Sequence, residues 1–227
     1  MPAFFLLSLT LFLIWCLFLV FSKNTRQEQL LISVIGIIFM PLVLALASLD
    51  PRGQPTDMIF SLGIEDLLFS FSLFGLAAII YQAVLGRHLR RLKVKKPIIT
   101  PFGQTIILIM VWTLLAIAFL LVYNFPLLTA LVTSGVLIGI YVIIRRRDLF
   151  LDALLSSLFL TFMLFILEQI YFVHLFPTSA ELVWHRLGLS GIIIGGIPLE
   201  ELLWIAVIGF AVGPLYEFVR SLRLTKK

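Results

Sequence analysis

Apolar residues dominate the chain in runs of about twenty, and short polar or charged segments separate these runs. A helix needs about 20 apolar residues to cross the hydrocarbon core of a bilayer, so each run predicts a membrane-spanning helix. We therefore expect an all-α polytopic membrane protein in which residues 1–227 form a single membrane domain. The seven predicted helices lie at roughly 3–22, 29–48, 64–85, 102–123, 125–144, 149–175 and 199–219.

Composition and charge agree with this pattern. Hydrophobic residues make up 61% of the chain, and the mean hydropathy is +1.14, which is typical of membrane proteins. Of the 17 Lys and Arg residues, 15 fall on one side of the seven-helix arrangement, and only Arg52 and Arg186 fall on the other. The positive-inside rule then predicts a multi-pass protein of the cell membrane, with its N-terminus outside and its C-terminus in the cytoplasm. No basic run is interleaved with aromatics, so nucleic acid is not an expected partner.

Two stretches of the sequence resemble each other at an offset of 135 residues. They are GIEDLLFSFSLFGLAAIIY, which starts at Gly63, and IPLEELLWIAVIGFAVGPLY, which starts at Ile197. Each contains the third helix of a group of three. The pattern predicts two parallel three-helix repeats, 1–85 and 124–227, because an odd connecting helix keeps the second unit from being inverted. Residues 86–123 would supply the basic loop and this linker helix.

Each of the two stretches carries a pair of adjacent acids, Glu65–Asp66 and Glu200–Glu201, which align with each other at that offset. Acids in the first turn of a helix are stabilised by the helix dipole, so a structural role is one interpretation. However, both pairs are preceded by apolar residues, and ionisable groups at membrane depth usually mark function. A carboxyl group in a low dielectric has a raised pKa, and a second carboxylate raises the pKa further. A protonated acid beside an ionised base can then perform acid–base catalysis.

Three further residues are candidates for substrate binding. Phe69 and Trp204 each follow an acid pair by about one helical turn, so they lie near it on the helix surface. Aromatic faces can stabilise a carbocation without capturing it. Glu168, within the sixth predicted helix, either joins the site or pairs with a polar neighbour such as Gln169.

The segments PLEELLW at 198–204 and GIEDLLF at 63–69 resemble the paired P-x-E-[ED]-x-x-[FW] motifs of the integral-membrane lycopene cyclase domain family. The arrangement is similar to the fused two-repeat form of these heterodimeric-type carotenoid cyclases. Gly63 departs from the usual proline, and Trp204 from the more common phenylalanine. The resemblance implies a lycopene cyclase-like intramolecular lyase or isomerase. Such an enzyme cyclises the acyclic ends of a membrane-embedded carotenoid without net redox change. The catalytic residues it implies are Glu200, Glu201, Glu65 and Asp66.

Two other functions remain open from the sequence. CAAX-type intramembrane proteases also use a Glu-Glu pair, but their E-E-x-x-x-R motif would need an arginine where this chain has Ile205. The second open function is that of a non-enzymatic seven-helix protein that binds lipid or carotenoid. A retinal photoreceptor is excluded, since no lysine lies between Pro198 and Phe218 for a Schiff base. The chain has no dinucleotide fingerprint and no credible metal cluster, so neither a cofactor nor a metal is expected.

Polar residues at the helix ends away from the two acid pairs can be interpreted without catalysis. Tyr81 and Tyr216 follow the glutamates by sixteen residues, ~24 Å along a helix, and are expected in an aromatic belt at the cytoplasmic interface. Glu217 is expected in the headgroup region. Asp148 and Asp152 have the spacing of diphosphate sites, but capping and dipole effects at the start of the sixth helix explain them better.

Overall fold

The structure is a computed structural model that describes residues 2–22, 24–49, 63–86, 88–91, 100–179 and 190–225. Within these ranges, seven helices are long and apolar enough to cross a membrane. The predicted all-α, polytopic fold is confirmed.

The helices follow the predicted runs closely. A 3₁₀ turn at Arg147–Leu149 leads into the sixth spanning helix, and a π-helix at Gln169–Leu175 continues it. Two pairs of short strands complete the described part. The helices are α1 (Pro2–Phe21), α2 (Arg26–Leu49), α3 (Ile64–Leu85), α4 (Pro101–Leu121), α5 (Leu127–Arg145), α6 (Phe150–Glu168), α8 (Leu199–Val212) and α9 (Leu215–Arg220). The strands are β1 (His88–Arg91), β2 (Ile193–Ile194), β3 (Ile197–Pro198) and β4 (Leu222–Thr225).

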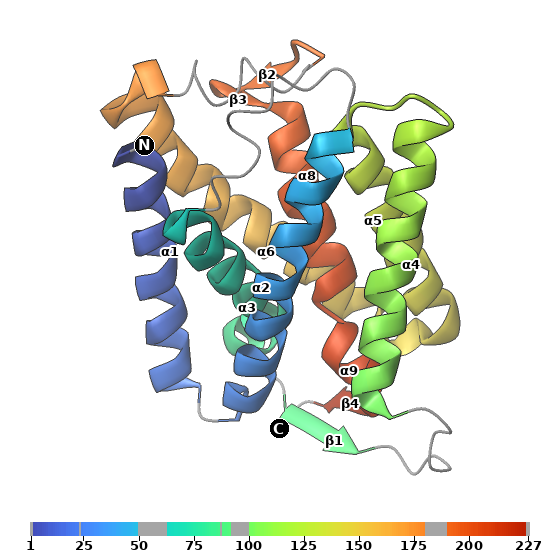
Figure 1. The fold of residues 1–227 in the computed structure, drawn as a ribbon. Helices are drawn as coiled ribbons and strands as arrows, with labels where there is room; N and C mark the ends of the chain where they lie inside the picture. The colour runs from blue at the N-terminus through green and yellow to red at the C-terminus, as the bar shows by residue number, and fades with distance from the viewer. Residues whose placement is uncertain are drawn as a thin grey trace.

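The helices form one bundle whose two ends differ (Figure 1). At one end, β2 and β3 pair as a short antiparallel hairpin directly before α8; we call this the hairpin end. At the other end, β1 pairs antiparallel with β4; we call this the ribbon end. The N-terminus lies toward the hairpin end and the C-terminus lies at the ribbon end (Figure 1).

Two elements occupy the centre of the bundle, α3 and the α8–α9 segment, and these are the most buried of the spanning segments. α3 packs against α1 and α2, while α8 packs against α5 and α6. Glycines permit the closest approaches. A Cβ on Gly36 of α2 would lie 2.5 Å from the Ser70 carbonyl oxygen, and one on Gly209 of α8 would lie 2.6 Å from the Ser157 Cα. Small residues at such crossings allow helix backbones to pack tightly in a membrane.

Two of the spanning helices depart from regular α geometry. The predicted sixth helix, 149–175, changes to π geometry after Glu168, so the side chains beyond this point rotate relative to a regular helix. The predicted seventh helix, 199–219, breaks where Gly213 and Pro214 separate α8 from α9. Proline cannot donate a backbone hydrogen bond within a helix, which explains the break.

Candidate active site

Glu200 and Glu201 lie in the first turn of α8, where the β2–β3 hairpin feeds into the helix. The Leu199 N–H donates to the Ile192 carbonyl oxygen at 2.9 Å, which ties the start of α8 to the hairpin. Glu200 Oε1 accepts a hydrogen bond from the Ser190 N–H at 2.6 Å. Its other oxygen, Oε2, is buried and has no hydrogen-bond partner. One oxygen of Glu200 is therefore held in place while the other is available.

Glu168 and Glu201 form the most enclosed pair of carboxyl groups at this end. Glu168 is the last residue of α6 and is only 2% exposed, and Glu201 is partly buried. The two groups lie close enough to repel each other when both are ionised. Glu168 Oε2 has no hydrogen-bond partner. The side-chain amide of the next residue, Gln169, donates to the Gly195 carbonyl oxygen, which ties this end of α6 to the hairpin that precedes α8.

The change to π geometry begins immediately after Glu168. Single-turn π segments within helices are frequent at functional sites, because they reorient side chains that a regular helix would place elsewhere. Tyr171, within this π-helix, shares a hydrogen bond of 2.6 Å with the Thr10 hydroxyl of α1. The π-helix thus fixes the end of α6 against α1.

The first acid pair has a more structural setting. Glu65 and Asp66 lie in the first turn of α3, and Asp66 Oδ2 accepts a hydrogen bond from the Gly63 N–H at 2.9 Å. This contact caps the helix, as the dipole interpretation expects. Glu65 is partly buried. Among the described residues, no hydrogen bond or ion pair joins this pair to Glu200 or Glu201.

Phe69 and Trp204 contact different parts of the bundle. The Phe69 ring lies 5.4 Å from the Phe4 ring of α1, measured between centroids. Trp204 stacks on Phe39 of α2, with centroids 6.5 Å apart and planes inclined by 15°. Phe39 also contacts Trp112 of α4 at 5.0 Å. Trp204 therefore joins an aromatic cluster in the middle of the bundle, whereas Phe69 packs at its α1 side.

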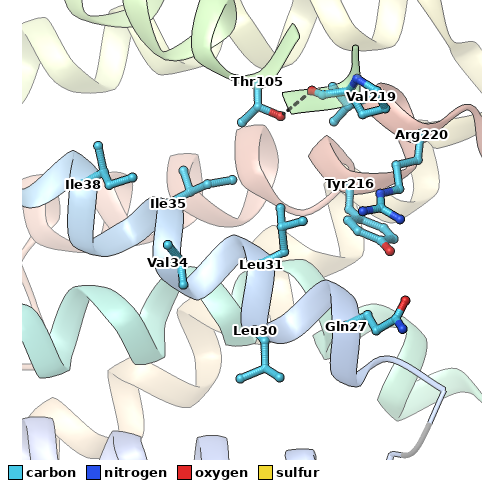
Figure 2. A pocket seen from close by; sticks show the side chains of 11 residues that line it. Gln27, Leu30, Leu31, Val34, Ile35, Ile38, Thr105, Tyr216, Val219 and Arg220 are labelled. Carbon is cyan, nitrogen blue, oxygen red and sulfur yellow. Dashed lines mark hydrogen bonds between the residues drawn. The ribbon is translucent and has the colours of Figure 1, made fainter. Parts of the chain in front are cut away.

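A groove of about 680 Å³ opens between α2, α4 and α9 in the ribbon half of the bundle (Figure 2). Aliphatic side chains form most of its wall. Gln27, Tyr216 and Arg220 lie together at one end of it (Figure 2). Arg220 sits over the Tyr216 ring, 5.0 Å from the centroid. The aliphatic wall residues are Leu30, Leu31, Val34, Ile35, Ile38 and Val219.

The groove adjoins a narrow cavity in the core, because Ile35 lines both. Phe39, Phe74 and Trp112 also line this cavity. The volume of this cavity is only about 10 Å³. Since Phe39 also stacks on Trp204, packed apolar and aromatic side chains connect the groove to the turn of α8 that follows Glu201. This connection was not predicted from the sequence, because it depends on how α2 crosses α4 and α8.

A second group of polar side chains at the ribbon end was also missed. Glu28, Gln82 and Glu217 are 1%, 2% and 0% exposed, so the side chain of Glu217 lies inside the bundle and not on its surface. Asp152 lies in the first turn of α6, as the dipole interpretation expects, but it is 1% exposed and no side-chain hydrogen bond caps the start of α6. One signal was present in the sequence: Gln82 and Glu217 are separated by the repeat offset of 135, and the structure joins them by a hydrogen bond of 2.5 Å.

The tyrosines beside these residues also differ from expectation. Tyr81 and Tyr216 are each only 4% exposed, so they pack inside the bundle and do not form an aromatic belt. Asp148 does lie at the surface, where it forms an ion pair with Arg146 at 2.7 Å. Across the described ranges, no group of three or more His, Cys, Asp or Glu side chains has the arrangement of a metal site.

Fold and site together define a polytopic helical membrane protein with paired carboxyl groups beside an aromatic core. A family model described as lycopene cyclase matches residues 126–219, which run from the start of α5 into α9. The match covers less than half of the chain, and over these residues it supports the resemblance to a lycopene cyclase domain family that was stated from the sequence; the fused two-repeat form stays a prediction. No curated protein and no solved structure matches the chain. The family match supports a carotenoid cyclase, and therefore an enzyme of the cyclase type; it gives no support to a CAAX-type protease.

Proposed function

We propose that the protein cyclises acyclic carotenoid ends of the lycopene type within the membrane by acid–base chemistry. The observation that carries this proposal is the position of the family match, which includes Glu168, Glu200, Glu201 and Trp204. The enclosed Glu168–Glu201 pair and the unpartnered oxygen of Glu200 support it further, because carboxyl groups in an apolar setting can donate and accept protons.

The reaction can be written with no net change in composition. A carboxylic acid delivers its proton to a terminal C=C bond, which leaves a tertiary carbocation. A neighbouring C=C bond attacks this cation, so one C–C bond forms and closes the ring. A carboxylate then removes a proton from an adjacent carbon and restores a double bond. Because the steps are redox-neutral, they call for no oxidant or reductant.

We assign these roles from the contacts of each group. The Glu168–Glu201 pair is the proposed proton donor, since two neighbouring carboxyl groups in an apolar site are most easily accommodated when they share a proton. Glu200 is the proposed acceptor, because its Oε2 is unpartnered while Oε1 is fixed by Ser190. Trp204 would stabilise the cation through its ring face. Glu65 and Asp66 form a proposed second acid pair, with Phe69 as its aromatic neighbour.

The apolar groove is the proposed route of entry from the bilayer. A carotenoid is a long hydrocarbon that dissolves in the membrane, and the groove wall is aliphatic. From the groove, the lining continues through Ile35 and Phe39 to Trp204. Ligand sites in proteins are mostly apolar with a few placed polar groups, and this path ends at such groups.

The proposed function is tested by expressing the protein in cells that accumulate lycopene and analysing their pigments. We expect a product of unchanged mass and altered retention. Cells that retain only lycopene, despite normal protein levels, would contradict the proposal. A protein that binds the pigment but leaves it unchanged would favour the non-enzymatic alternative.

Orientation in the membrane is a separate prediction from the charge distribution. A reporter fused after Lys227 is expected to be cytoplasmic, and one inserted near Thr178 is expected to be external. The hairpin end, with Glu200 and Glu201, would then face outward. Reporter activity with the opposite pattern would place the candidate site on the cytoplasmic side.

A further inference from the structure

Three carboxyl groups and one carboxamide are buried together at the ribbon end, where four helices meet. Glu28 comes from α2, Gln82 from α3, Asp152 from α6 and Glu217 from α9. Each side chain is at most 2% exposed. Charged groups at membrane depth are costly and usually mark function. The proposed cyclisation does not use these residues, since Glu217 is sixteen residues from Glu201 along the α8–α9 segment, about 24 Å in a regular helix.

The hydrogen bonds of this cluster centre on Gln82. Its Nε2 atom lies 3.0 Å from Glu28 Oε1, 2.8 Å from Glu28 Oε2 and 2.5 Å from Glu217 Oε1. The carboxyl groups of Glu28 and Glu217 therefore meet at one nitrogen atom, Gln82 Nε2. Two ionised carboxylates gathered there would have only acceptor oxygens, so a proton on one of them would supply a donor. Ser156 donates to Asp152 Oδ1 at 3.2 Å.

Several acceptors in the cluster lack a donor. Gln82 Oε1, Asp152 Oδ2 and Glu217 Oε2 are buried without a hydrogen-bond partner. A buried acceptor that is left unsatisfied destabilises the fold. A buried water, a bound cation or an additional proton can supply what these oxygens lack.

The nearby positive side chains are engaged elsewhere. Arg146 pairs with Asp148, and it donates to the backbone carbonyl oxygens of Glu217 at 3.2 Å and Leu222 at 2.6 Å. It therefore approaches the cluster from its edge and contacts no carboxyl group within it. Three other basic side chains of the neighbouring helices have contacts outside the cluster: Arg26 donates to the Leu19 and Val20 carbonyl oxygens, Arg145 lies over Tyr141, and Arg220 lies over Tyr216.

We propose that this cluster is a proton-binding site in which the Glu28 and Glu217 carboxyl groups share a proton. A proton fits better than a metal ion, because the described acids here do not have the arrangement of a metal site. A carboxylic O–H also supplies a donor where the two carboxyl groups meet at Gln82 Nε2. The shared proton joins α2 to α9, next to Gln82 of α3, and so links the two halves of the bundle at the ribbon end.

Infrared spectroscopy of the purified protein tests the site directly, because protonated carboxyl groups absorb separately from carboxylates. At neutral pH, the difference between the wild type and Glu28→Gln/Glu217→Gln is expected to contain a protonated carboxyl band that the double variant lacks. Glutamine keeps the shape and the hydrogen bonds but cannot hold the proton. Asp148→Asn is the matched control, since it removes an ion-paired surface acid at the same end and should leave the band unchanged.

The stability of the wild type gives a second readout that needs no variant to fold. We expect its melting temperature to fall as alkaline pH removes the proton, since loss of a ligand bound to the native state destabilises that state. The double variant should lack this part of the pH dependence. A difference spectrum without the band would overturn the proposal. So would a melting temperature that depends on sodium or a divalent cation through Glu28 and Glu217, which would identify a metal site. Pigment conversion is measured separately, so this site and the cyclase proposal can fail independently.

Discussion

Glu201→Gln is expected to abolish carotenoid cyclisation, with a loss of at least about 100-fold in the rate of conversion. Glutamine preserves the size of the side chain and much of its hydrogen bonding, but it can neither deliver nor accept the proton that the reaction needs. Glu200→Gln should cause a comparable loss, and Glu65→Gln and Asp66→Asn should impair conversion severely. The measurement is the initial rate of pigment conversion, normalised to the amount of protein in the membrane.

Normalising the rate to the amount of protein separates a catalytic role of these acids from a structural one. If the acids only stabilise helix termini, each amide variant should lose at most about 1 kcal/mol of stability and still convert pigment. Asp66 is the residue for which this alternative has most support, since its carboxylate caps α3 through Gly63. Asp148→Asn serves as the control acid, since Asp148 is ion-paired at the opposite end of the bundle. Glu217 is unsuitable as a control because it is buried in a cluster of its own.

Val34→Trp is expected to reduce conversion by about tenfold, which corresponds to about 1.4 kcal/mol of lost transition-state binding. Val34 is 52% exposed and lines the groove between α2 and α4, so an indole at this position would fill the proposed route of the carotenoid. The substitution would leave the carboxyl groups at the hairpin end unchanged. The loss should therefore appear at limiting substrate and be relieved as the carotenoid content of the membrane rises.

Ile37→Trp is the matched control for the groove. Ile37 lies on the same helix and is 37% exposed, but it does not line the groove. Equal losses in both variants would mean that bulk on α2 disturbs the bundle and that the groove is not the route. Retention of pigment by the purified Val34→Trp protein at the wild-type level would argue against the route as well.

The seven spans could be predicted from the sequence because the apolar runs match the bilayer thickness so closely. The start of α3 was placed correctly at residue 64, where a polar segment meets an apolar run. The lycopene cyclase resemblance rested on the motif at 198–204, and the family match covers this motif. The two parallel repeats and their linker stay a prediction, although α3 and α8 have corresponding packing partners.

Contacts between helices could not be derived from periodicity. Almost every residue of these spans is apolar, so hydrophobicity does not show which face of α2 meets α4 and which faces lipid. The same reason hid the ribbon-end cluster. Glu28 is in the first turn of α2, where an acid is expected at the surface, and only the way α3 and α9 pack over it reveals that it is buried. The π-helix after Glu168 likewise has no recognisable sequence signal.

Cyclisation in heavy water tests the acid–base account most directly. Membranes that contain the protein and lycopene are equilibrated in D₂O, and the mass of the product is measured. The account predicts one solvent deuterium in each ring that forms, since a carboxyl group in exchange with the solvent delivers the first proton and a different hydrogen leaves. A cyclised product without deuterium, or one whose mass shows net oxidation or reduction, would contradict it.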